Sequence, residues 1–296
     1  MNEIYRAGTI KRDRRTKGRM DTLDAQIMAV LKEDHPQSVR HVFYRMTDPR
    51  LSEPVEKSDR GYRHVQSRCV KLRRTGLIPY NWIADLSRQG YFTNTFDDAG
   101  DFIRQMGGLY RADLWRDADV KCEVWAESRS IASVMLTDCK ELAVDLYPCG
   151  GFSSLSFVHA AAQSHNARHD SKPLVVIYLG DFDPAGVLID VALQRELREH
   201  LRSDIDLDFR RIGINEEQVE VYDLPTKPRK DGDKRSQHVT YSVEAEAMPA
   251  RDLRYLLRYE VESMLPEGAL HTAKVAEQSE RQHLQNMAAM FEQGAR

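Results

Sequence analysis

The most apolar run of the chain, Leu-Val-Val-Ile-Tyr-Leu at residues 174–179, limits the fold more than any other feature. Successive side chains of a strand point to opposite faces, so an apolar run of this kind predicts a strand buried on both sides. Strand and helix patterns alternate around it, with strands predicted at 120–126 and 144–147 and helices at 130–143, at 153–165 and from Gly186 to about Leu201. This alternation predicts an α/β domain with a parallel sheet and helices on both faces.

Acidic side chains follow two of these predicted strands. Glu127 comes directly after the first strand, and Asp181 and Asp183 come after the apolar run. Ligands of open parallel sheets bind at the carboxyl ends of the strands, so we expect the three acids to meet there. They would repel one another without a cation, and hard oxygen ligands favour Mg²⁺ or Mn²⁺. The alternative is a simple capped turn, in which Asp183 and Pro184 start the next helix.

Three short helices are predicted in the first 76 residues, at 21–34, 39–47 and 58–75. Each has apolar residues spaced three and four apart, and Gly76 is a typical residue for ending a helix. The following segment, 77–83, has strand and turn character and would suit a wing. Together these segments predict a helix-turn-helix unit. The alternative is an ordinary helical domain with a salt-bridged surface helix.

Positive charge is concentrated in the same part of the chain. Residues 1–76 contain 18 Lys and Arg against 10 Asp and Glu, a net charge of +8, and the remaining residues carry −11. This asymmetry is typical of a nucleic-acid-binding module joined to another domain. We therefore expect binding to double-stranded DNA through the basic residues of the third helix: Arg60, Arg63, His64, Arg68, Lys71, Arg73 and Arg74.

Arg40 and Tyr44 are four residues apart on the second predicted helix, so they lie on one face beside its apolar stripe. A phenol has a pKa near about 10 and needs activation before it attacks phosphorus. Arg40 could stabilise the phenolate or the charge of the transition state. Residue chemistry alone does not nominate Tyr44 as a nucleophile, because a tyrosine in this position is usually a partly buried core residue.

Two motifs together resemble those of the family formed by the DNA-cleaving subunit of topoisomerase VI and the meiotic double-strand-break transesterase. Val-Arg-His-Val-Phe-Tyr-Arg at 39–45 resembles the motif that carries the family's catalytic tyrosine. Glu127 and Asp-Phe-Asp at 181–183 resemble the acids of a Toprim domain, and the two motifs occur in the family's order. The resemblance covers roughly residues 20–265 and is closest to stand-alone bacterial or mobile-element members.

The resemblance implies a role for each of these residues. Tyr44 would attack a DNA phosphate and form a 5′-phosphotyrosyl link, assisted by Arg40. Glu127, Asp181 and Asp183 would bind Mg²⁺, or Mn²⁺ in its place, with Glu127 also serving in catalysis. Family members are homodimers in which the tyrosine of one protomer meets the metal site of the other. The implied domains are a basic flexible arm at 1–19, a winged-helix DNA-binding domain at 20–92, a connector at 93–118, a Toprim-like metal-binding domain at 119–265 and a C-terminal helical segment at 266–296.

The sequence also differs from the family pattern. Ser128 follows Glu127 where many Toprim proteins carry lysine, and topoisomerase activity would require a separate ATPase partner. The chain is similar as well to the Toprim nuclease subunits of Wadjet-type plasmid defence, where metal-activated water could replace tyrosine. Three functions follow: magnesium-dependent DNA cleavage by tyrosine transesterification, hydrolysis of DNA by a metal-dependent nuclease, or DNA binding without catalysis.

No run of about 18 apolar residues is present, so no transmembrane helix is expected. The four cysteines lie far apart and the N-terminal residues are basic, which favours a reducing cytoplasm over secretion. We expect Glu244 and Glu246 to be surface acids rather than part of a metal site, and His165 to be exposed to solvent.

Overall fold

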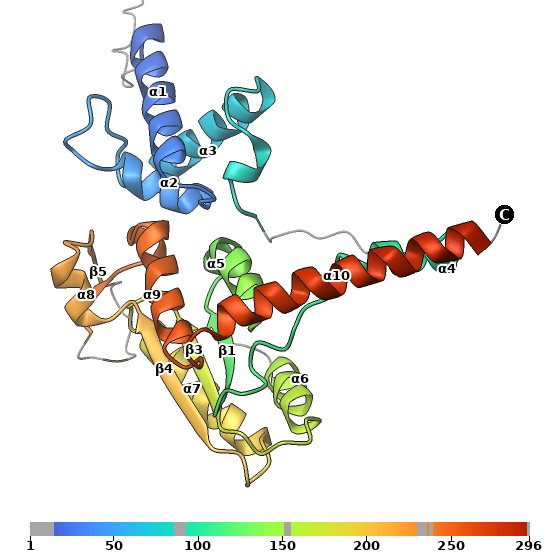
Figure 1. Cartoon of the computed structure of the whole chain (residues 1–296). Coiled ribbons are helices and arrows are strands. Elements are labelled where there is room, and N and C mark those ends of the chain that lie inside the picture. Colours follow the sequence, from blue (N-terminus) through green and yellow to red (C-terminus); the bar gives the residue numbers. More distant parts are fainter. Residues whose placement is uncertain (1–14, 86–92, 151–154, 230–235, 237–238, 295–296) are drawn as a thin grey trace, which may run out of the picture. The chain divides into compact units, whose positions relative to one another are not determined.

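The chain forms two compact units, residues Met1–Ile83 and Ala84–Arg296, which are described separately below as unit 1 and unit 2. The computed structural model describes residues 15–85, 93–150, 155–229, 236 and 239–294 (Figure 1). Most of the predicted flexible arm, and the predicted domain end at residue 92, lie outside the described residues. Within the described residues, none of the helices is both long and apolar enough to cross a membrane.

The described residues of unit 1 form three α-helices, each of which begins after a hydroxyl side chain that accepts a hydrogen bond from the first helical turn. These caps satisfy backbone N–H groups that have no partner inside the helix. The buried side chains include Leu23, Ile27 and Val42, which belong to the predicted apolar stripes. The helices are α1 Lys17–Glu33 after Thr16, α2 Val39–Met46 after Ser38 and α3 Asp59–Arg74 after Ser58.

The segment predicted as a wing does not form a strand. Tyr80–Trp82 is a 3₁₀-helix, and Ile83 makes a single β-bridge with Gln37. Arg73 explains this conformation, because its Nη2 donates to the carbonyl oxygen of Tyr80 at 2.8 Å and its guanidinium stacks 4.7 Å from the Tyr80 ring. These contacts hold the segment against the end of α3. The described residues of unit 1 therefore contain the three predicted helices without a β wing.

Unit 2 contains the predicted parallel sheet, which confirms the mixed α/β fold. The strand order is β2-β1-β3-β4, and all neighbours are parallel. All six residues of β3 are buried, which agrees with the prediction from its uninterrupted apolar run. The strands are β1 Lys121–Ala126, β2 Asp145–Pro148, β3 Leu174–Leu179 and β4 Leu207–Gly213.

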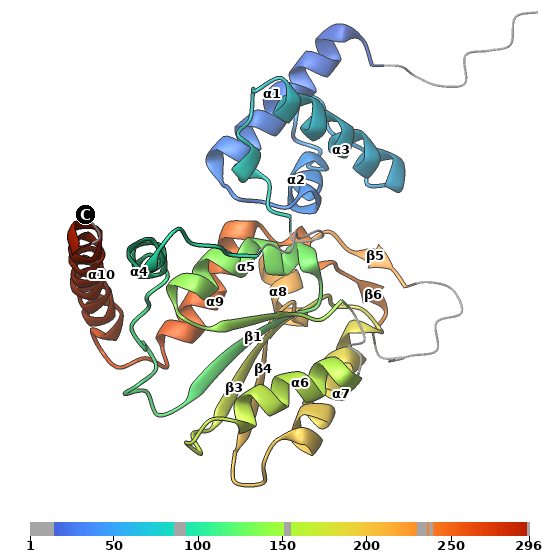
Figure 2. The same ribbon diagram turned by 90° about the vertical axis from the view of Figure 1, so that its right-hand side faces the viewer.

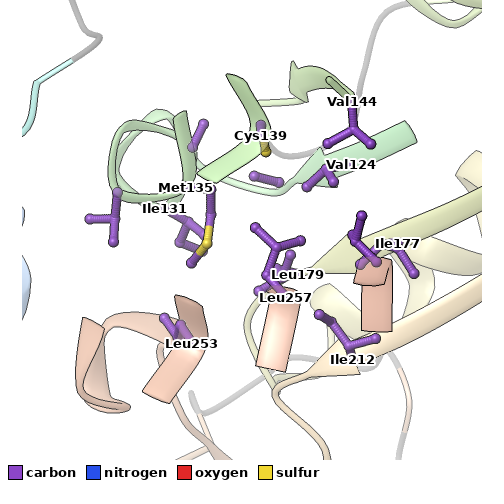
Figure 3. Close-up of a cluster of buried hydrophobic side chains, with 14 of the residues drawn as sticks. Val124, Ile131, Met135, Cys139, Val144, Ile177, Leu179, Ile212, Leu253 and Leu257 are labelled. Carbon is purple, nitrogen blue, oxygen red and sulfur yellow. The ribbon is translucent and has the colours of Figure 1, made fainter. Parts of the chain in front are cut away.

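Helices cover both faces of the sheet, as Figure 2 shows. Ile177 and Leu179 of β3 pack in the cluster that includes Ile131, Leu253 and Leu257 (Figure 3). Val176 and Tyr178 point the other way and pack with a second set of helices. The first face is covered by α5 Arg129–Glu141 and α9 Ala250–Glu262, and the second by α6 Leu155–Asn166 and α7 Gly186–His200.

The remaining elements of unit 2 lie outside these layers. The long helix α10, Ala269–Gly294, lies alongside α4, Ala99–Gly107, in both views (Figures 1 and 2). The residues expected to form a connector thus include a helix that packs within unit 2. Near the carboxyl edge of the sheet are α8 Glu216–Val221, the antiparallel pair β5 Lys227–Pro228 and β6 Tyr241–Ser242, and the 3₁₀-helix Ala245–Ala247.

Candidate active site

The pairing of β1 with β3 brings two of the predicted acidic segments together. Ala126 and Leu179, the last residues of the two strands, are direct partners in the parallel ladder. The ladder continues one residue further, because the backbone N–H of Glu127 donates to the carbonyl oxygen of Leu179 at 2.8 Å. Glu127 therefore leaves the sheet beside Gly180 and Asp181.

The carboxylate of Glu127 is hydrogen-bonded to the segment that follows β3. Its Oε2 accepts from the backbone N–H of Asp181 at 2.9 Å and from the hydroxyl of Tyr178 at 3.3 Å. Gly180 allows this approach, because a Cβ at this position would lie only 2.5 Å from Glu127 Oε2. The structure thus places Glu127 directly against the Asp-Phe-Asp segment.

Asp181 is fixed by its neighbours on the other side. Its Oδ1 accepts from the backbone N–H of Ala245 at 2.8 Å, and Phe182 forms an antiparallel bridge with Val243. Arg211 donates to the carbonyl oxygen of Asp181 and pairs with Asp190 at 2.8 Å. The backbone around Asp181 is therefore held by contacts with segments far away in sequence.

Asp183 performs the capping role that the sequence left open as an alternative. Its Oδ1 accepts from the backbone N–H groups of Ala185 at 2.8 Å and Gly186 at 2.6 Å, at the start of α7. Its charge nevertheless acts on the site, since it is one of the influences that raise the pKa of Glu127. Asp183 therefore contributes charge to the site while one of its oxygens caps α7.

Burial and mutual repulsion disfavour the charged forms of these acids. Burial raises the pKa of Asp181 well above its ordinary value, and the nearby carboxylates of Glu127 and Glu246 raise it further. Burial also raises the pKa of Glu127, against the lowering effects of the Asp181 N–H group and Arg211. Within the described part of the chain, no lysine or arginine forms an ion pair with Glu127, Asp181 or Asp183. A divalent cation would supply the missing positive charge.

Glu127, Asp181 and Asp183 are oxygen donors of the kind that Mg²⁺ and Mn²⁺ prefer. As the side chains are placed, no group of three or more His, Cys, Asp and Glu residues among those described could hold a metal ion. One oxygen of each predicted ligand accepts from backbone N–H groups. The other carboxylate oxygens, Glu127 Oε1, Asp181 Oδ2 and Asp183 Oδ2, make no hydrogen bond to the described residues. Such oxygens are the donors that these cations prefer.

Glu246 is a member of the acidic cluster that the sequence-based interpretation missed. We expected a surface acid, but Glu246 is only 5% exposed, and Ser128 Oγ donates to its Oε1 at 3.4 Å. Its neighbour Glu244 is partly exposed and pairs with Lys227 at 2.5 Å. The chain reaches this position through the bridge between Phe182 and Val243, a long-range contact that leaves no local pattern in the sequence.

His165 was also expected to be exposed, and the structure shows otherwise. Its ring is buried in unit 2, with Nδ1 3.8 Å from Glu123 Oε1. The other oxygen of Glu123 accepts from Trp125 Nε1 at 3.1 Å. His165 belongs to α6, and Glu123 and Trp125 belong to β1, so this buried group contributes to the fold rather than to the acidic cluster.

Tyr44 lies in unit 1 and is buried, with 6% of its surface exposed. Its ring packs against Phe43, and Lys57 Nζ lies 5.7 Å from the ring centroid. The guanidinium of Arg40 lies over the ring of Tyr62, 5.1 Å from its centroid. Tyr44 thus has the environment of a core residue, which is the interpretation that residue chemistry alone favoured.

The basic residues of α3 divide into separate groups. Arg68 forms an ion pair with Asp24 of α1. Its Nε lies 2.6 Å from Asp24 Oδ1, and both side chains are largely buried. Arg73 is engaged with Tyr80, as described above. The exposed residues are Arg60 and Arg63 in the first half of the helix and Lys71 and Arg74 in its last turn, and His64 is half-buried.

Comparisons with known proteins identify no relative. No family model matches the chain, and neither a curated protein nor a solved structure gives a significant match.

Proposed function

We propose that this chain binds double-stranded DNA and cleaves its phosphodiester backbone with Mg²⁺ or Mn²⁺ bound at the carboxyl edge of the sheet. The observation that carries the proposal is the contact between Glu127 and the Asp181 segment, in a buried cluster where neither acid has a cationic ion-pair partner among the described residues. A group of this kind is costly to the fold without a cation, so a binding role explains it better than a structural one.

The proposed role of each residue follows from the contacts of its side chain. Glu127 and Asp181 would bind the cation through the oxygens that make no hydrogen bond to the described residues, and Asp183 would do so while it caps α7. Glu246 adds negative charge close to Asp181, where it raises the pKa of the Asp181 carboxyl group. The cation itself would polarise the phosphate and stabilise the departing oxygen. Arg211 holds the backbone of Asp181 in place and thereby positions its carboxylate.

Two nucleophiles compete within this proposal. The motif at 39–45 supports Tyr44, assisted by Arg40, with the two sites brought together in a homodimer as in the family that the motif resembles. Strand passage would additionally require a separate ATPase partner. The burial of Tyr44 supports the second candidate, in which metal-activated water hydrolyses DNA. A third possibility, DNA binding without catalysis, would leave the acidic cluster unexplained.

Incubation with supercoiled plasmid and Mg²⁺ or Mn²⁺, followed by denaturation with and without protease, tests these proposals. Protein-linked linear DNA identifies tyrosine as the nucleophile, free linear DNA identifies water, and uncut plasmid refutes cleavage. Tyr44→Phe should abolish cutting in the first case and preserve it in the second. Glu127→Gln should slow either reaction by about 100-fold or more, because it removes charge at the reacting phosphate. Glu217→Gln, at an exposed position of α8, is the matched control and should cut normally.

A further inference from the structure

A groove of about 1050 Å³ runs along unit 1 between the beginning of α1 and the first half of α3. We refer to it as the arginine groove, because its polar lining consists mainly of Arg15, Arg19, Arg60 and Arg63, with His64 and one acid, Glu56. Among the residues that the structure describes, no tyrosine, tryptophan, phenylalanine, asparagine or glutamine lines it. The described lining therefore offers positive charge and hydrogen-bond donors, and it has no aromatic ring on which a base could stack.

One wall of the groove is held in position by Glu53. The carboxylate of Glu53 is buried, and its two oxygens accept from Arg15 Nε at 2.5 Å and Arg19 Nε at 2.9 Å. Arg15 Nη2 also donates to the carbonyl oxygen of Pro54 at 3.1 Å. Both guanidinium groups are thus oriented before any ligand arrives, which reduces the entropy that binding would cost. The Arg19 side chain remains 45% exposed.

The opposite wall is supplied by α3. Arg60 and Arg63 are exposed, and neither forms an ion pair with any residue that the structure describes. Arg63 Nε donates to the carbonyl oxygen of Asp59, at 3.3 Å. Even when Glu53 and Glu56 are counted against the four arginines, two positive charges remain in excess. The positive potential also acts on His64. Burial is the largest cause that lowers the pKa of His64, and the charges of Arg15, Arg68 and Arg60 lower it further.

We propose that the arginine groove binds the phosphodiester backbone of double-stranded DNA, with Arg15 and Arg19 on one wall and Arg60 and Arg63 on the other. The inference rests on the DNA-binding part of the proposed function. The sequence predicted phosphate contacts along the whole of α3, whereas the groove places them on the first half of that helix. It also adds Arg15, which precedes α1, and Arg19, in the first turn of α1. Phosphate contacts of this kind fix the position of a protein on the duplex and carry no sequence information directly.

The size and chemistry of the groove favour a polymer over a small anion. Small-molecule sites usually enclose about 300–1,000 Å³ and are lined mainly by apolar and aromatic groups. The arginine groove slightly exceeds that range, and its lining is mostly charged. Planar guanidinium groups on two walls match a row of phosphates, each of which can accept two parallel hydrogen bonds from one arginine.

The test measures DNA binding without cleavage. The full chain is titrated into a fluorescein-labelled duplex in EDTA at several salt concentrations, and fluorescence anisotropy gives the affinity. Arg19→Ala, Arg60→Ala and Arg63→Ala should each weaken binding roughly three- to tenfold. Each should also reduce the slope of log affinity against log salt concentration by about 0.9, the value for one lost phosphate contact. Duplexes of unrelated sequence should respond equally.

Lys71→Ala and Arg74→Ala change exposed basic residues in the last turn of α3, outside the groove, and should weaken binding less than the three groove variants do. Lys140→Ala, at an exposed position of α5, is the control and should bind DNA as the unchanged protein does. Wild-type affinity and salt slope in the three groove variants would overturn the inference, as would larger losses in Lys71→Ala or Arg74→Ala or tighter binding of single-stranded DNA than of duplex. Circular dichroism confirms that every variant is folded.

The same variants separate this inference from the cleavage proposal. If the groove variants lose binding while the unchanged protein never cuts plasmid, the groove stands and the cleavage proposal fails. If the unchanged protein cuts plasmid and the groove variants bind normally, cleavage stands and the groove assignment fails.

Discussion

Gly180 separates β3 from Asp181, and its missing side chain is what allows Glu127 to reach Asp181. In Gly180→Ala, the new Cβ would lie 2.5 Å from Glu127 Oε2 and 2.7 Å from both Cε1 and the hydroxyl oxygen of Tyr178. Ordinary contacts begin at 3.4 Å, so the Glu127 carboxylate must retreat by about 0.9 Å. Tyr178 is fully buried and cannot move aside, so the hydrogen bond from Asp181 N–H to Glu127 should be lost.

Two magnitudes follow from this displacement. Misplacing a reacting group by about 1 Å costs roughly 100-fold in rate, so plasmid cleavage by Gly180→Ala should fall by about that factor. Overpacking of a buried site costs about 1–3 kcal/mol of stability, which lowers the melting temperature of a domain of this size by roughly 2–12 °C. Calorimetry and a plasmid-cleavage time course measure the two effects. Gly108→Ala is the control, because the nearest atom to its Cβ would be Gln105 O at 3.6 Å.

Two results would refute the reasoning in different ways. A variant with both wild-type melting temperature and wild-type cleavage would show that Gly180 does not govern the approach of Glu127 to Asp181. A variant that melts earlier but cuts at the normal rate would show that the Glu127 carboxylate plays no part in cleavage.

Two further predictions concern charge and stability. Asp181→Asn should raise the free energy of unfolding at pH 8, because the raised pKa of Asp181 means that its charged form destabilises the folded state. This gain in stability should shrink as the pH falls and vanish below pH 3.8, where the carboxyl group is protonated in both the folded and the unfolded state. Urea unfolding of both proteins across this pH range measures the gain. A gain that grew towards low pH would contradict the prediction. Arg68→Ala should cost about 2–4 kcal/mol in urea unfolding, because it leaves Asp24 largely buried without its partner. Arg74→Ala should change stability by less than about 0.5 kcal/mol, and an equal effect of the two variants would argue against the Asp24 contact.

The sequence predicted those elements that depend on interactions between residues close together in the chain. The buried strand β3 was predicted with its observed bounds, because a strand covered on both faces typically has an uninterrupted apolar run. The start of α2 at Val39 followed from Ser38, whose side chain indeed accepts from His41 N–H. In each case the decisive interaction lies within a few residues, so a local pattern was sufficient.

Long-range contacts account for what the sequence did not reveal. β4 was not predicted, because Asp208, Arg210 and Arg211 interrupt its apolar pattern. Arg210 pairs with Asp208 of the same strand and with Glu260 of α9, and Arg211 pairs with Asp190 of α7. The wing was predicted from local strand character, but the contact of Arg73 with Tyr80 imposes a helical turn. The meeting of Glu127 with the Asp181 segment followed from sheet topology, whereas the burial of Glu246 depends on a bridge between distant segments.

The order of contacts along the chain has a consequence for biosynthesis. The acidic cluster needs Glu127 at the end of β1, Asp181 after β3 and the Ala245–Ala247 turn, so it cannot form on the ribosome until translation has passed Glu246. The residues that line the arginine groove end at Ser67, and unit 1, in which it lies, ends at Ile83. A growing polypeptide therefore acquires its basic surface early and its acidic cluster late, and an unfinished chain lacks the complete cluster.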